Sequence, residues 1–233
     1  MLGTAPAKDT AQTPMPSPFA PVLSRYAEAL PPVFREQFLL PAEAPYHLVL
    51  EGVLDRIWHR PRWVWPILWA LAQGNVIFLD VGEDIRISMT VRSGRTASGQ
   101  PYQHWLRTFY FPRRRFFNAT AAYDARLGKV IEWLCPKRLL GLLWEMELQA
   151  PATLVITSDR SFIRLGRHRW WVPRWLCPRV RAVLHANASD EAHLAIEVTV
   201  AHLLPTPIFG YHGTFHVRRS DEPAAYRNGA AAA

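Results

Sequence analysis

The feature that most constrains the fold is a strict alternation of apolar and polar side chains from Ile85 to Val91. Every second side chain in this stretch is apolar, which is typical of a β-strand with one buried face. No helix-length pattern separates the strand-like segments that follow, so we expect antiparallel pairing without crossover helices. Turn-forming residues separate these segments, which are 102–111, 116–123, 129–134, 143–149, 153–157, 161–165, 179–186, 192–202 and 211–217.

Helical periodicity is confined to the part of the chain before residue 76. Large apolar residues recur every three or four positions from Phe19 to Leu30, and Pro31 and Pro32 end that helix. We expect a second helical turn at 33–39 and a third helix at 63–73. The sequence therefore predicts a mainly β domain of the α+β class. Its strongly curved antiparallel sheet, or barrel, has the N-terminal helices packed against it.

The chain has 233 residues, of which 49% are hydrophobic, which is enough for one large core. We expect a single domain over residues 19–219, preceded by a disordered leader at 1–18 and followed by a disordered tail at 220–233. The first residues lack the basic and apolar regions of a secretory signal. The apolar stretch 63–79 contains no Asp, Glu, Lys or Arg, but its 17 residues fall short of the roughly 20 that span a bilayer. With two widely spaced cysteines, Cys135 and Cys177, these features favour a cytoplasmic protein, free or at a membrane periphery.

The net charge of +8 admits two explanations. A basic surface attracts anionic membranes or nucleic acids. However, the 27 basic residues comprise 24 arginines and only 3 lysines, a bias that a GC-rich coding sequence also produces. The composition leaves both explanations open.

Motifs for common chemistries are absent. The sequence contains no phosphate-binding glycine loop, no hydrolase nucleophile elbow and no zinc-protease motif, so we expect neither a cofactor nor a metal ion. A hairpin turning near Pro205 would bring Glu197 close to His216. We interpret these residues, with His193, as part of a polar outer face of the sheet.

Tryptophan and arginine residues are concentrated in the segment 167–176, which includes Arg169, Trp170, Trp171, Arg174 and Trp175. Indole and guanidinium groups suit contact with the headgroups of an anionic membrane. The same side chains stack on single-stranded bases, or cover the open end of a sheet and pack on its core. Of these the structural role is favoured most and nucleic acid least. We expect residues 167–175 to form an exposed connection between strands, with at least two of Trp170, Trp171 and Trp175 reaching solvent.

The segment 104–111 supplies candidate ligand-binding residues. Alternation places Trp105, Arg107 and Phe109 on one face, and His104 and Tyr110 on the other. A buried guanidinium requires a carboxylate partner, so an inward Arg107 predicts an ion pair with one of the glutamates on later strands. Such a pair either anchors a polar ligand head or is structural. The glutamates concerned are Glu132, Glu145 and Glu147.

Several short motifs resemble the bacterial family known as domain of unknown function 4166. They are the proline- and tryptophan-containing run 172–180, Gly52-Val53 with Arg56, the Trp105-x-Arg107-x-Phe109 strand followed by Arg115-Phe116, and the closing Tyr211-His212-Gly213. The resemblance covers about residues 19–218. This chain departs from the family pattern near its end, because it has Tyr211-His212-Gly213 where the family pattern is Tyr-Arg-Gly. A ligand-binding role of the family's arginine therefore does not carry over to His212. The resemblance implies no assigned activity. Proteins of this family consist of the domain alone or carry it C-terminal to a saccharopine-dehydrogenase-like reductase domain. By analogy, this association points towards small-molecule or lipid metabolism.

Two functional hypotheses follow. The first is a non-catalytic module that binds a small apolar or lipid-like ligand, at or away from an anionic membrane surface. The second is an enzyme for a small apolar substrate that uses Glu132, His104 or Tyr110 as acid or base. The candidate ligand-binding residues are Arg56, His104, Trp105, Arg107, Tyr110, Glu132, Tyr211 and His212.

Overall fold

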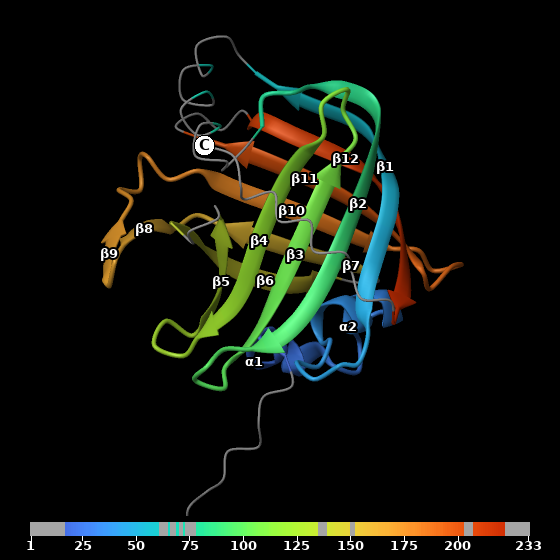
Figure 1. The fold of residues 1–233 in the computed structure, drawn as a ribbon, viewed down its shortest axis with the longest axis horizontal. Helices are drawn as coiled ribbons and strands as arrows, with labels where there is room; N and C mark the ends of the chain where they lie inside the picture. The colour runs from blue at the N-terminus through green and yellow to red at the C-terminus, as the bar shows by residue number, and fades with distance from the viewer. Residues whose placement is uncertain are drawn as a thin grey trace, which may run out of the picture.

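The computed structural model describes residues 17–60, 65, 69, 72, 78–134, 139–149, 152–202 and 207–221. It contains one antiparallel sheet of twelve strands and short helices near the N-terminus (Figure 1). The strands are β1 (His47–His59), β2 (Gly82–Arg95), β3 (Pro101–Phe109), β4 (Arg115–Asp124), β5 (Lys129–Leu134), β6 (Leu140–Gln149), β7 (Thr153–Ser158), β8 (Ser161–Leu165), β9 (His168–Trp171), β10 (Arg179–Ala186), β11 (His193–Ala201) and β12 (Pro207–Ser220).

Ten of the strands close into a barrel. Their order is β5-β4-β3-β2-β1-β12-β11-β10-β7-β6, and β6 pairs with β5 to complete the circle. Strands β8 and β9 form a hairpin outside this circle, in which β8 pairs with the first residues of β6. The hairpin projects from the side of the barrel, at the left of Figure 1.

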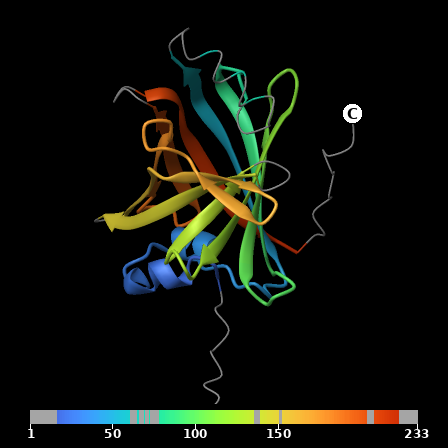
Figure 2. The same ribbon diagram turned by 90° about the vertical axis from the view of Figure 1, so that its left-hand side faces the viewer.

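The N-terminal segment closes one end of the barrel. It consists of α1 (Ala20–Leu23), the 3₁₀-helix η1 (Ser24–Tyr26) and α2 (Pro32–Phe38), which lie below the strands in Figures 1 and 2. Phe19 is fully buried, and its ring centroid lies 5.2 Å from that of Phe38 and 6.0 Å from that of Trp105 on β3. The Gln103 side chain donates a hydrogen bond to the Gln37 carbonyl and so ties α2 to the barrel wall. No helix of the described residues has the length and apolar composition needed to cross a bilayer.

The predicted mainly β architecture is confirmed, and every predicted strand is present. Strand β1 was not predicted, because Gly52 and a bulge between Leu54 and Arg56 interrupt its alternation. The predicted connection at 167–175 is also partly wrong, since residues 168–171 form β9. The backbone of β9 satisfies its hydrogen-bonding groups by pairing with β8.

Three further predictions concern segments that are only partly described. Of the predicted helix at 63–73, the structure describes residues 65, 69 and 72, which are helical. The predicted leader and tail lie outside the described residues, apart from 17–18 and 220–221. Ser17 is buried at the barrel end, and Ser220 pairs with His47 of β1.

The strands β1 and β12 approach each other unusually closely. A Cβ atom added at Gly52 would lie 1.9 Å from the Thr214 carbonyl oxygen, and one at Gly213 would lie 2.2 Å from the Val53 carbonyl oxygen. Both contacts are with backbone, which has little freedom to move. The two glycines therefore allow the local bend with which these long strands follow the barrel.

We predict that Gly52→Ala lowers the free energy of unfolding by about 2–3 kcal/mol, because the added methyl overlaps backbone atoms. Urea denaturation measures this loss. Gly99→Ala is the control: it lies in a turn with φ of +79° and open space around it, so strain of about 1 kcal/mol is expected. A Gly52 variant no less stable than the Gly99 variant would contradict the close approach.

Candidate ligand-binding cavity

The barrel encloses a cavity of about 460 Å³. Alternate residues of the strands point into it, so its wall is mostly apolar; on β10 and β11, for example, they are Val180, Ala182, Leu184, Leu194, Ile196, Val198 and Val200. Phe38 of α2 contributes to the wall from the closed end. The volume lies within the range of about 300–1,000 Å³ that is usual for small-molecule pockets.

An ion pair interrupts this apolar wall. The Arg107 Nη2 atom of β3 donates a hydrogen bond to Glu132 Oε1 of β5 at 3.2 Å, and the two side chains are only 10% and 9% exposed. The guanidinium carbon also lies 5.1 Å from the ring centroids of Trp105 and Phe117. The prediction that an inward Arg107 pairs with a nearby glutamate is therefore confirmed.

Burial controls the protonation of this pair. Desolvation raises the pKa of the Glu132 carboxyl, and the positive charge of Arg107 opposes that rise. Burial also raises the pKa of the Tyr211 phenol, so this side chain carries its proton at neutral pH. The cavity thus holds a cation, its counter-ion and a neutral hydroxyl.

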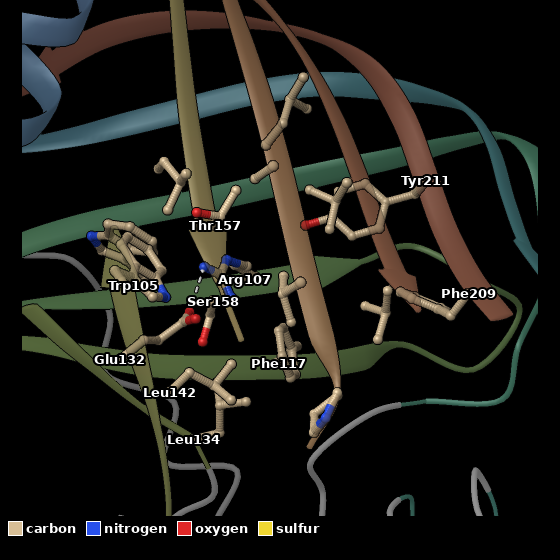
Figure 3. A pocket seen from close by; sticks show the side chains of 18 of the residues that line it. Trp105, Arg107, Phe117, Glu132, Leu134, Leu142, Thr157, Ser158, Phe209 and Tyr211 are labelled. Atoms are coloured by element: carbon tan, nitrogen blue, oxygen red, sulfur yellow. Dashed lines mark hydrogen bonds and ion pairs between the residues drawn. The ribbon is translucent and has the colours of Figure 1, made fainter. Parts of the chain in front are cut away.

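Tyr211 of β12 and Thr157 and Ser158 of β7 complete a polar cluster around the ion pair. Figure 3 shows the Tyr211 hydroxyl pointing towards the group formed by Arg107, Glu132 and these two residues. The guanidinium has five N–H donors and makes one side-chain hydrogen bond among the described residues, to Glu132. The cluster therefore offers unused hydrogen-bond donors to the interior of the cavity.

Two more polar atoms of the cavity wall lack a partner. Gln37 Oε1, near the closed end, and His202 Nδ1, after β11, are buried and make no hydrogen bond among the described residues. His202 Nε2 is 3.0 Å from the Leu176 carbonyl oxygen. Buried polar atoms without partners are uncommon and call for water or a ligand.

The structure separates the predicted ligand-binding residues into two groups. Trp105, Arg107, Glu132 and Tyr211 line the cavity, and the other four predicted residues lie elsewhere. Arg56 is exposed, 3.8 Å from Glu83. His104 is on the outer face of β3 and forms a hydrogen bond with Thr120. The Tyr110 ring lies between the guanidinium groups of Arg86 and Arg114. The His212 ring nitrogen Nε2 lies 3.8 Å from a carboxylate oxygen of Asp55.

Sequence reasoning missed Phe117, Thr157, Ser158 and His202 as cavity residues. The inward orientation of Phe117 and Ser158 depends on the barrel register, for which the local sequence carries no signal, and Thr157 borders the cavity although it pairs with the exposed residues Glu145 and Arg181. The expected proximity of Glu197 to His216 is wrong, because the β11–β12 register pairs Glu197 with His212 and His193 with His216.

The β8–β9 hairpin has two different faces. Phe162 and Trp171 are paired, and their face packs on the outside of the barrel, where Arg164 and Arg169 lie over Trp133. The opposite face carries the pair Ile163 and Trp170, and its Ser161, Ile163 and Val172 line the cavity. The cavity wall therefore continues outwards along this second face of the hairpin.

The tryptophans of the segment 167–176 reach solvent, as predicted. Trp170, Trp171 and Trp175 are 64%, 44% and 64% exposed. Their surroundings differ, because Trp171 contacts Phe162 and lies beneath the Arg160 guanidinium. Arg169 likewise has a structural partner, since its Nη1 lies 2.6 Å from Asp124 Oδ2.

We predict that breaking the buried ion pair is more destabilising than removing it. Glu132→Leu should lower the free energy of unfolding by about 3–5 kcal/mol, because it leaves the Arg107 charge buried without a partner. The double variant Arg107→Met/Glu132→Leu should regain most of that loss. Urea denaturation of both variants measures the difference, and a double variant as unstable as the single one would contradict a desolvated pair.

Comparison with known proteins places the chain in a family. The family model described as "Domain of unknown function (DUF4166)" matches residues 30–215. The chain is also 27% identical over 139 residues to the uncharacterised protein YndH of Bacillus subtilis (strain 168), an alignment that covers 59% of this chain and 67% of that protein. Because the model spans most of the barrel, including the cavity, the chain belongs to the DUF4166 family.

Proposed function

We propose that this protein is a binding module for a small apolar or lipid-like ligand held inside the barrel. The observation that carries the proposal is an apolar cavity with one polar cluster at its wall. A cavity of about 460 Å³ is of the size that usually holds one small molecule. That size fits a single short chain or a small cyclic compound, and it is too small to enclose a phospholipid with two acyl chains.

The geometry favours binding over the alternative of acid–base catalysis. Of the three residues considered for that role, only Glu132 lines the cavity, whereas His104 and Tyr110 do not. Acid–base chemistry needs titratable groups that reach the same substrate. Glu132 is instead engaged by Arg107, and burial raises the pKa of the Tyr211 phenol, which also lines the cavity, so that this phenol keeps its proton.

Blocking the cavity should abolish ligand binding. Ala182 of β10 lines the cavity, so Ala182→Trp should fill it and remove the binding of a neutral fluorescent probe, N-phenyl-1-naphthylamine. The matched control is Ala195→Trp on β11, whose alternation points residue 195 to the outer face of the barrel. Fluorescence titration compares the two with the unmodified protein. Equal probe binding by all three would contradict a ligand site in the barrel.

We further propose that the protein meets an anionic membrane at the end of the barrel opposite the helices. Apart from Val53, the exposed large hydrophobic residues of the described chain lie in the β8–β9 hairpin or beside connections at that end. Arg113, Arg114, Arg167 and Arg174 are exposed in the same connections and would attract anionic headgroups. The outward continuation of the cavity wall along Ile163 and Trp170 supports exchange of an apolar ligand at this surface.

The two faces of the hairpin allow a matched vesicle experiment. We predict that Trp170→Ala/Trp175→Ala weakens co-sedimentation with vesicles containing phosphatidylserine at least about tenfold, because both indoles are free to insert. Trp171→Ala should bind vesicles normally and be less stable, because its ring packs on Phe162. Binding should also weaken as salt is raised, since salt screens the arginines. Failure of the unmodified protein to bind these vesicles at low salt would contradict the membrane proposal.

A further inference from the structure

The polar cluster in the cavity combines unused donors with a balanced charge. Arg107 and Tyr211 present N–H and O–H donors, and Glu132 neutralises the Arg107 charge. Given the proposed ligand site, we propose that it selects ligands with an uncharged head that accepts hydrogen bonds, such as an ester or another carbonyl group. In this proposal Glu132 is the specificity-determining residue, because it rejects carboxylate heads.

The donors determine which uncharged head fits. The guanidinium makes one side-chain hydrogen bond within the described residues, and the Tyr211 hydroxyl makes none. A carbonyl oxygen placed between them would accept from both. A plain hydrocarbon would leave these donors without partners in an apolar cavity, which is unfavourable. The site therefore discriminates a carbonyl compound from an alkane of the same length.

The charge balance of the cavity explains why a ligand with a carboxylate head does not fit. Of the titratable groups that line the cavity in the described part of the chain, Arg107 is on β3, Glu132 on β5 and Tyr211 on β12, while His202 lies after β11. Arg107 is the permanently charged cation among these groups, and it already forms an ion pair with Glu132. A ligand carboxylate would add a second negative charge beside Glu132 in a region of low dielectric, where like charges repel strongly. An uncharged oxygen meets no such repulsion.

Three ligands of equal chain length test this inference: methyl dodecanoate, dodecanoate and dodecane. Each competes with the neutral probe N-phenyl-1-naphthylamine at pH 8, where the acid is ionised. We expect the ester to bind at least about tenfold more tightly than either of the others. Glu132→Gln keeps an oxygen for Arg107 and removes the negative charge, so it should reverse the preference between ester and carboxylate.

A second variant decides the matter if Glu132→Gln does not fold. The triple variant Arg107→Met/Glu132→Leu/Tyr211→Phe removes the donors and the charges together, so it should bind dodecane as tightly as the ester. Carboxylate binding equal to or tighter than ester binding in the unmodified protein would overturn the inference. A triple variant that still prefers the ester over dodecane would also overturn it. Failure of the probe to bind the unmodified protein would instead refute the proposed function, so the two failures are distinguishable.

Discussion

The interior of a closed ten-stranded barrel is too wide for its inward-pointing side chains alone to fill. The rest of the structure follows from that constraint. Barrels of eight strands are just wide enough for side chains to occupy the interior or to hold one small ligand. Here the aromatic side chains of the N-terminal segment, with Phe19 and Phe38 at its centre, fill one end of the wider barrel. The remaining interior is a cavity of about 460 Å³. The helices thus serve as the base of the cavity.

The second constraint is the charge placed in this interior. A guanidinium in an apolar wall is tolerated because Glu132 neutralises it and because Trp105 and Phe117 lie beside it. The same arrangement gives the cavity its polarity, since it leaves donors exposed and no net charge. Stability and ligand preference therefore depend on the same pair of side chains.

The sequence predicted those parts of the fold that local patterns encode. Alternation located most strands, and the absence of helical segments between them predicted an antiparallel sheet that is strongly curved or closed into a barrel. It also placed Arg107 between Trp105 and Phe109, so that an inward Arg107 predicted a partner among three glutamates, of which the structure selects Glu132. Strand β1 was not predicted, because the break in its alternation depends on its neighbour β12. There Gly52 of β1 lies against the Thr214 carbonyl of β12. His104 and Tyr110 were wrongly grouped with the cavity because one strand alone does not reveal which face is inside.

The most direct test of the account is native mass spectrometry of the protein purified from its own host without detergent. We predict a population that carries one additional small apolar compound, which Ala182→Trp removes and Ala195→Trp retains. Tandem fragmentation of the released compound would identify an uncharged carbonyl head. Protein that carries no adduct, and whose spectrum is unchanged after incubation with methyl dodecanoate, would contradict a ligand-binding role for the barrel.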